Sequence, residues 1–120
     1  MERSAAAPGP MVQGFGANGF RIDGAYFRAA LLTVTTATAW SPPPLEALTT
    51  ETLTLLLAER PEFILLGTGP TLRRPPLPLI AALDAAGIGL EPMDSRAAAR
   101  AWGILRVEGR QVAAALYPLD

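Results

Sequence analysis

Between residues 49 and 103 the chain alternates between segments of helical pattern and short apolar segments of strand length. A first helix is predicted from a cap at Thr49 or Thr50, because a threonine oxygen can accept from the free N–H groups of a first turn, to a stop at Arg60-Pro61. The run Phe63–Leu66 is apolar throughout, as in a strand buried on both faces. Helices and strands that alternate in this way predict an α/β layer with parallel strands and right-handed crossovers.

The alternation continues beyond this strand. A proline-led helix is predicted from Pro76 to Ala86, with Gly87 in the position of a C-cap. A second short strand follows over Ile88–Glu91. We therefore expect a βαβαβ-type C-terminal half in which these two strands lie parallel.

The last third of the chain begins with a cap signal. Asp94 or Ser95 is expected to cap a third helix, which Gly103 is expected to end. The segments Ile104–Glu108 and Gln111–Tyr117 are then predicted to pair as a β-hairpin around Gly109-Arg110.

The first half of the chain has a different residue pattern. Glycines punctuate short runs of β-forming residues between Met11 and Trp40, and the tract Ser41–Pro44 ends them because proline cannot donate to a sheet ladder. These strands are expected to join the main sheet or to form a small second one. Residues 1–10 lack the apolar core of a secretion signal and are read as a flexible tail, which leaves residues 11–120 as one α/β domain in the cytoplasm.

Composition excludes several classes of chemistry. The 120 residues include no cysteine and no histidine, and all ten basic residues are arginine. Thiolate, imidazole and lysine chemistry are therefore excluded, and carboxylates, hydroxyls and guanidinium groups remain. A net charge of -1 gives no indication of nucleic-acid binding, and no run approaches the roughly 20 apolar residues of a membrane helix.

Two polar segments follow the predicted parallel strands and are expected to lie at one sheet edge. Gly67-Thr68-Gly69 could bring backbone N–H groups to a phosphate, but Leu72 stands where a dinucleotide fingerprint needs a third small residue, so a tight turn is favoured. Asp94 could act as a general acid or base, but an N-cap formed by Asp94 or Ser95 is favoured since no activated nucleophile is evident.

Charged residues surround this edge. Arg96 and Arg100 lie four residues apart on one helix face, so together with Arg73 and Arg74 they could clamp a carboxylate, a phosphate or an acidic partner protein. Internal pairing of Arg100, for example with Glu108, with Arg96 solvated, is favoured over the clamp.

The last candidate segment is Glu108-Gly109-Arg110, which is read as a hairpin tip with a surface ion pair. No cluster has metal-ligand spacing, so neither a metal nor a cofactor is expected. The candidate binding residues, with no catalytic ones among them, are Gly67, Thr68, Gly69, Asp94, Ser95, Arg96, Arg100, Glu108 and Arg110.

An ordered set of short motifs from Met11 to Pro118 resembles a family of uncharacterised bacterial and archaeal proteins. That family also includes mitochondrial complex I assembly factor 3 and the adipogenesis-associated domain-containing protein. The motifs are Gln13-Gly14-Phe15, Gly19-Phe20-Arg21-Ile22, Trp40, Leu66-Gly67-Thr68-Gly69, Met93-Asp94-Ser95, Ala98, Arg100, Glu108-Gly109-Arg110 and Ala113-Ala114-Ala115-Leu116.

The resemblance implies a three-layer α/β fold around a mixed sheet, and no established enzymatic activity. The family often has threonine, cysteine, threonine and asparagine where this chain has Ser95, Ala99, Ala101 and Gly103. Ser95 keeps a capping oxygen, whereas Ala99 removes any thiol chemistry. The mitochondrial member implies a protein partner, and respiratory-complex subunits are the partners that it suggests. A homo-oligomer is a further expectation.

Two functions follow as hypotheses. The first is a non-catalytic interaction or assembly module that serves a membrane complex from the cytoplasmic side. The second is a small-molecule binding protein or modest enzyme, with an anionic ligand held at the carboxyl edge of the parallel strands.

Overall fold

The first half of the chain forms the β structure that its glycine-punctuated runs predict. In the computed structural model, which describes residues 9–17 and 19–120, strands β1 (Val12–Gly16), β2 (Gly19–Ile22) and β3 (Ala25–Phe27) make an antiparallel sheet in the order β1-β2-β3. In β2, the side chains of Phe20 and Ile22 are buried and Arg21 is exposed, which is the alternation of a strand with one face on the core.

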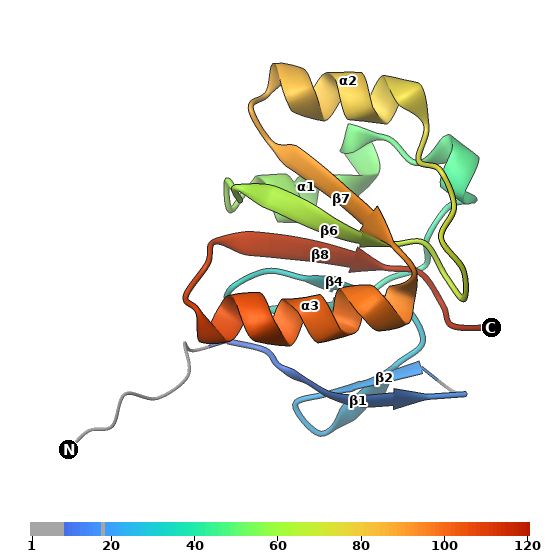
Figure 1. Ribbon diagram of the computed structural model, residues 1–120, viewed down its shortest axis with the longest axis vertical. Helices are drawn as coiled ribbons and strands as arrows, with labels where there is room; N and C mark the ends of the chain where they lie inside the picture. The colour runs from blue at the N-terminus through green and yellow to red at the C-terminus, as the bar shows by residue number, and fades with distance from the viewer. Residues whose placement is uncertain (1–8, 18) are drawn as a thin grey trace.

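A second, five-stranded sheet is the centre of the molecule (Figure 1). Its strands are β4 (Ala30–Leu32), β5 (Ala37–Ala39), β6 (Phe63–Gly67), β7 (Gly89–Met93) and β8 (Val112–Leu116), in the order β5-β4-β8-β6-β7. Strand β6 runs parallel to both β7 and β8, whereas β4 is antiparallel to β8 and β5. The sheet is therefore mixed, as expected, and the first half contributes strands both to it and to the separate small sheet.

The helices cover both faces of this central sheet. Two 3₁₀ turns, η1 (Leu45–Ala47) and η2 (Thr50–Leu53), lead into the short helix α1 (Thr54–Leu57), and the longer helices are α2 (Leu77–Ala85) and α3 (Ser95–Val107). Because β7 and β8 flank β6 on opposite sides, right-handed crossovers place α2 and α3 on opposite faces of the sheet. Figure 1 shows α3 beside the β1–β2 hairpin.

Two apolar clusters separate three layers. One lies between the central sheet, α3 and the small sheet, and contains Phe20, Ile22 and Trp102. The other lies between the opposite sheet face, the 3₁₀ turns, α1 and α2. Strand β8 runs between the two clusters and contributes three buried alanines, Ala113, Ala114 and Ala115, alternately to each. The α/β single-domain, three-layer expectation is confirmed.

The predicted closing hairpin is wrong. Helix α3 does not end at Gly103 but continues to Val107, and the segment after it forms β8, which is parallel to β6. A glycine inside a helix costs about 1 kcal/mol, and the burial of Trp102 and Arg106 on the inner face of α3 offsets that cost. The true stop is Gly109, whose φ of 76° suits a helix C-terminus.

Strand β7 forms one edge of the central sheet and carries a proline. The N–H of Gly89 donates to the carbonyl of Glu62, and the carbonyl of Met93 accepts from Thr68, so alternate residues of β7 bond towards β6. Leu90 and Pro92, between them, therefore direct their backbone groups to the open side. Since Pro92 has no N–H, it removes a donor from that edge.

The described part of the N-terminal segment is held against the domain by Pro10. Of the predicted tail, residues 1–8 lie outside the described residues, and Pro10 is buried with its carbonyl accepting a hydrogen bond of 2.9 Å from Trp102 Nε1. Across the described part of the chain, no helix has the length and apolar character needed to cross a bilayer.

Candidate functional site

The carboxyl ends of β6, β7 and β8 meet at one edge, and Ser95 joins all three. Its hydroxyl donates to the carbonyl of Tyr117, which follows β8, and accepts from the N–H of Gly69, which follows β6; both distances are 2.8 Å. The N–H of Ser95 also donates to the carbonyl of Gly69 at 2.8 Å. Ser95 is fully buried, so its polar groups are engaged inside the protein and not with solvent.

Thr68 is a second buried hydroxyl at this edge. Its Oγ1 lies 2.7 Å from the carbonyl of Thr71 and 3.2 Å from that of Met93, and it accepts from the N–H of Arg73 at 2.9 Å. The hydroxyl thereby closes the turn after β6. Gly67, Thr68 and Gly69 hold the loop after β6 against the start of α3. Their arrangement is that of a tight turn, the interpretation that the sequence favours.

Asp94 occupies the N-cap position of α3. Its Oδ1 accepts from the N–H of Ala97 at 2.9 Å, and its backbone is extended, as is usual for an N-cap. The carboxylate thus serves a free N–H of the first helical turn, as the favoured interpretation predicts.

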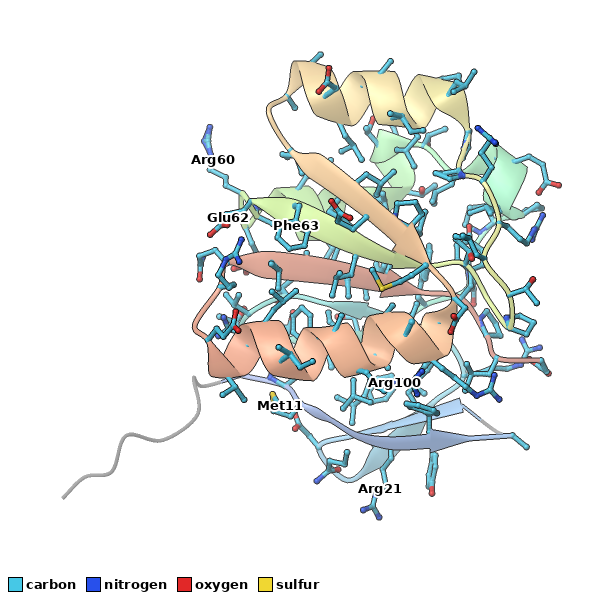
Figure 2. All side chains as sticks on the ribbon, viewed as in Figure 1. Met11, Arg21, Arg60, Glu62, Phe63 and Arg100 are labelled. Carbon is cyan, nitrogen blue, oxygen red and sulfur yellow. The ribbon has the colours of Figure 1, made fainter. Side chains whose placement is uncertain are left out.

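The four arginines considered as one clamp are divided between the two faces of the sheet. Arg100, on α3, places its guanidinium carbon 5.5 Å from the ring centre of Phe15 in β1, a cation–π contact. Figure 2 shows Arg100 directed from α3 towards β1. Arg73, in the loop that leads to α2, instead lies 3.6 Å from Glu46. No ion pair between Arg100 and Glu108 occurs among the described residues.

Glu108 and Arg110 lie at the opposite end of the sheet from Ser95. Glu108 is the C-cap residue of α3, and Arg110 pairs with Glu62 at 2.9 Å, close to the ring of Phe63. The hydrogen bond from Arg110 holds the pKa of the Glu62 carboxyl below its ordinary value. Both groups are exposed, so this is a surface ion pair joining β6 to the turn before β8, and not a hairpin tip.

Sequence reasoning did not find a groove beside the carboxyl edge. Trp40 and Tyr117 form an edge-to-face pair with ring centres 5.1 Å apart, and the Tyr117 hydroxyl donates to the carbonyl of Pro43 at 2.8 Å. Burial raises the pKa of Tyr117 to about 12. A groove of about 740 Å³ passes these rings and the proline tract, with Arg28 and Arg73 also lining it. The available signal was an aromatic residue beside a proline tract, Trp40 before Pro42–Pro44.

A second groove lies between α2 and β7, which we call the α2–β7 groove. Its volume is about 580 Å³, and it is lined by Leu72, Arg73, Arg74, Pro75, Ile80, Leu90 and Pro92. Leu72 is 64% exposed and Ile80 is 37% exposed. Leu77, three residues before Ile80 on α2, is 69% exposed. Large apolar side chains and two arginines therefore gather on this surface.

The described residues contain no group of three or more acidic side chains that could hold a metal ion. The side chains described above offer hydrogen bonding, apolar contact, and carboxylate and guanidinium charge.

Comparison with known proteins places the chain among uncharacterised relatives. The model of a family described as proteins of unknown function (DUF498/DUF598) matches residues 12–117. An uncharacterised protein of Rhodobacter capsulatus is 36% identical over 110 residues, which cover 90% of this chain and 84% of that protein.

Solved structures give the same fold. A crystal structure from Bordetella parapertussis matches with a TM-score of 0.83 and 28% identity, covering 97% of this chain and 99% of that one. A Bordetella pertussis protein described as a Mth938-like domain matches with a TM-score of 0.80 over 98% of this chain and 91% of that one, and at 24% identity it shows the fold alone. The chain belongs to the DUF498/DUF598 family of proteins of unknown function.

Proposed function

We propose that this chain is a non-catalytic module that binds another protein and assists the assembly of a larger complex in the cytoplasm. The observation that carries the proposal is the α2–β7 groove, where exposed Leu72 and Ile80 lie beside Arg73 and Arg74. Exposed apolar side chains gathered next to charged ones are typical of protein-binding surfaces.

The internal hydrogen bonds of the side chains at the carboxyl edge support a role without catalysis. Ser95, Thr68 and Asp94 each use their oxygens to hold the edge and α3 together. Histidine and lysine, the usual bases that activate a hydroxyl nucleophile, do not occur in this chain, and the carboxylate of Asp94 accepts from the N–H of Ala97.

The chemistry of the groove indicates what kind of partner fits it. Leucine, isoleucine and proline side chains suit an apolar segment, and Arg74 at the rim suits an acidic residue beside it. Pro92 removes a backbone donor from the open edge of β7, which favours recognition through side chains over strand addition. The resemblance to the mitochondrial assembly factor makes complex I subunits the first partners to test.

The test combines capture with a deletion. Tagged wild-type protein and an Ile80→Asp/Arg74→Glu variant, both checked for folding, would be used to capture proteins from the native host, and each captured protein would be purified for direct binding measurements. A Tyr26→Asp/Arg60→Glu variant is the matched control, since Tyr26 and Arg60 are exposed and lie outside the groove.

We expect complex I subunits with the wild type and the control, and their loss with the groove variant. A deletion strain with normal complex I content and activity would reject the link to complex I. Equal binding by the groove variant would reject the groove as the binding surface.

The alternative is a binding protein for an anionic ligand, and the Trp40–Tyr117 groove favours it because Arg28 and Arg73 line the same groove. Arg28 is paired with Asp120 at 3.1 Å and Arg73 with Glu46 at 3.6 Å, so an anion would have to compete with both carboxylates. Thermal unfolding with added phosphate or succinate tests this function. A rise in Tm that Arg73→Ala abolishes would support it.

A further inference from the structure

The outer face of α3 carries apolar side chains that no described element covers. Ile104 is 63% exposed and Val107 is 62% exposed, although α3 buries Ala98, Ala99 and Trp102 on its inner face. A shallow hollow of about 480 Å³ runs along this face from Arg100 to Glu108, with Gly103 and Met11 on its side. In Figure 2, Met11 lies between α3 and β1.

We infer that this face binds a second copy of the same chain, with the two α3 helices packed antiparallel about a two-fold axis at Ile104. The surface is separate from the α2–β7 groove, so this inference is independent of the proposed function. Two-fold symmetry requires that, if one residue of the first copy meets a second residue of the other copy, the reverse contact also forms, and only a residue at the axis meets its own counterpart.

The spacing of charges on α3 meets that requirement. Arg100 and Glu108 lie four residues on either side of Ile104, which is about 6 Å along a helix in each direction. When two such helices run antiparallel with Ile104 against Ile104, Arg100 of each copy lies opposite Glu108 of the other. Ala101 then lies opposite Val107. The face is thus complementary in charge to itself in the antiparallel orientation.

Arg100 is already positioned for this contact. Its guanidinium lies over the ring of Phe15, which holds the side chain in place, while the N–H groups in the guanidinium plane stay able to donate. No carboxylate pairs with Arg100 among the described residues. Glu108 is exposed at the end of α3, where it can accept those hydrogen bonds.

Gly103 lets the two helices approach. A Cβ at this position would come within 4 Å only of the terminal methyl of Met11, at 3.8 Å. The missing side chain therefore leaves space beside Ile104 on the outer face. A single helix pair is smaller than a standard protein interface, so we expect a weak dimer that dissociates on dilution.

Charge reversal provides the first test, by sedimentation equilibrium of the full chain over a range of concentrations. Arg100→Glu and Glu108→Arg each place like charges opposite each other twice per dimer, and each is expected to raise the dissociation constant about tenfold or more. The double variant restores opposite charges and is expected to recover most of the affinity. Single and double variants that all associate as the wild type does, or a wild type that stays monomeric, would overturn the inference.

A crosslink provides the second test, because the natural chain has no cysteine. Ile104→Cys places one thiol beside the axis, so mild oxidation should give a covalent dimer at a rate at least tenfold above that of the control. Tyr26→Cys is the control, with a similar exposed fraction of 69% at the replaced residue. Equal crosslinking rates for the two variants would contradict an interface at Ile104.

Discussion

Gly67 and Ser95 are in direct contact, and the contact leaves no room for a side chain at position 67. A Cβ on Gly67 would lie 2.8 Å from Ser95 Oγ, 2.9 Å from Ser95 Cα and 3.0 Å from a methyl of Leu116. The first turn of α3 therefore rests directly on the end of β6. This contact brings the Ser95 hydroxyl within reach of both Gly69 and Tyr117.

Gly67→Ala is expected to destabilise the protein by about 1–3 kcal/mol, because the added methyl must displace the backbone of α3. Urea unfolding followed by circular dichroism measures the change. Gly14→Ala is the matched control, since a Cβ there meets nothing within 4 Å, and its effect should stay within about 1 kcal/mol. Equal effects of the two substitutions would show that the contact is not tight.

Ser95→Ala is expected to lower the free energy of unfolding by about 1–3 kcal/mol for each buried group that loses its partner. Those groups are the N–H of Gly69 and the carbonyl of Tyr117. Thr54→Ala removes an exposed hydroxyl that bonds within its own turn, and is expected to change stability by less than about 0.5 kcal/mol. A Ser95→Ala variant as stable as the wild type would mean that the hydroxyl bridge contributes nothing.

Asp94→Ala is expected to cost about 1 kcal/mol, whereas Asp94→Asn keeps a capping oxygen and should cost much less. Thermal and urea unfolding of both variants separates the two cases. If Asp94 acted through its charge, the asparagine variant would lose function while keeping its stability. Loss of partner capture by a stable Asp94→Asn protein would contradict a purely capping role.

Stability should fall as the pH rises from about 10 to about 12. Burial raises the folded-state pKa of Tyr117 to about 12 from an ordinary value of 10.0, so between these values the folded state holds a proton that the unfolded state has released. The stabilisation is present below pH 10 and is lost as the pH approaches 12. Urea unfolding against pH measures this dependence, and Tyr117→Phe should reduce it. The control Tyr26→Phe, at an exposed ring, should leave it unchanged.

Much of the fold was predictable from local chemistry. Pro76 and Gly87 bracket α2 as the start and stop signals require, with Gly87 at a φ of 76°. The apolar run at Phe63–Leu66 forms the central parallel strand, which belongs to both layers of core. The start of α3 at the Asp94 cap was also correct, whereas the first helix, predicted from a cap at Thr49 or Thr50, is instead the 3₁₀ turn η2 followed by the four-residue helix α1.

The end of α3 was not predictable from the nearest glycine. Gly103 and Gly109 are both stop candidates, and tertiary burial of Trp102 and Arg106 selects the later one. The predicted pairing of β8 was wrong as a consequence, because its expected partner, Ile104–Glu108, belongs to α3 and its C-cap. Its actual partners, β4 and β6, are distant in sequence.

The candidate site was only partly predictable. Gly67-Thr68-Gly69 and Asp94-Ser95 meet at one edge, as parallel strands require. The groove beside Trp40 and Tyr117 was missed because its walls come from segments far apart in the chain. No periodic pattern connects such residues, and only the sheet order brings them together.

Ala114, the middle one of the three alanines in β8, limits which substitutions the sequence can accept during evolution. With Ala114 buried in the same cluster as Trp102, the layer spacing is matched to a small residue on the strand and a large one on the helix. Dense interiors tolerate added volume at one position only when a neighbour gives it up. Substitutions at these two sites are therefore expected to be accepted in pairs during divergence, so that the distance between layers is inherited even where the individual side chains are not.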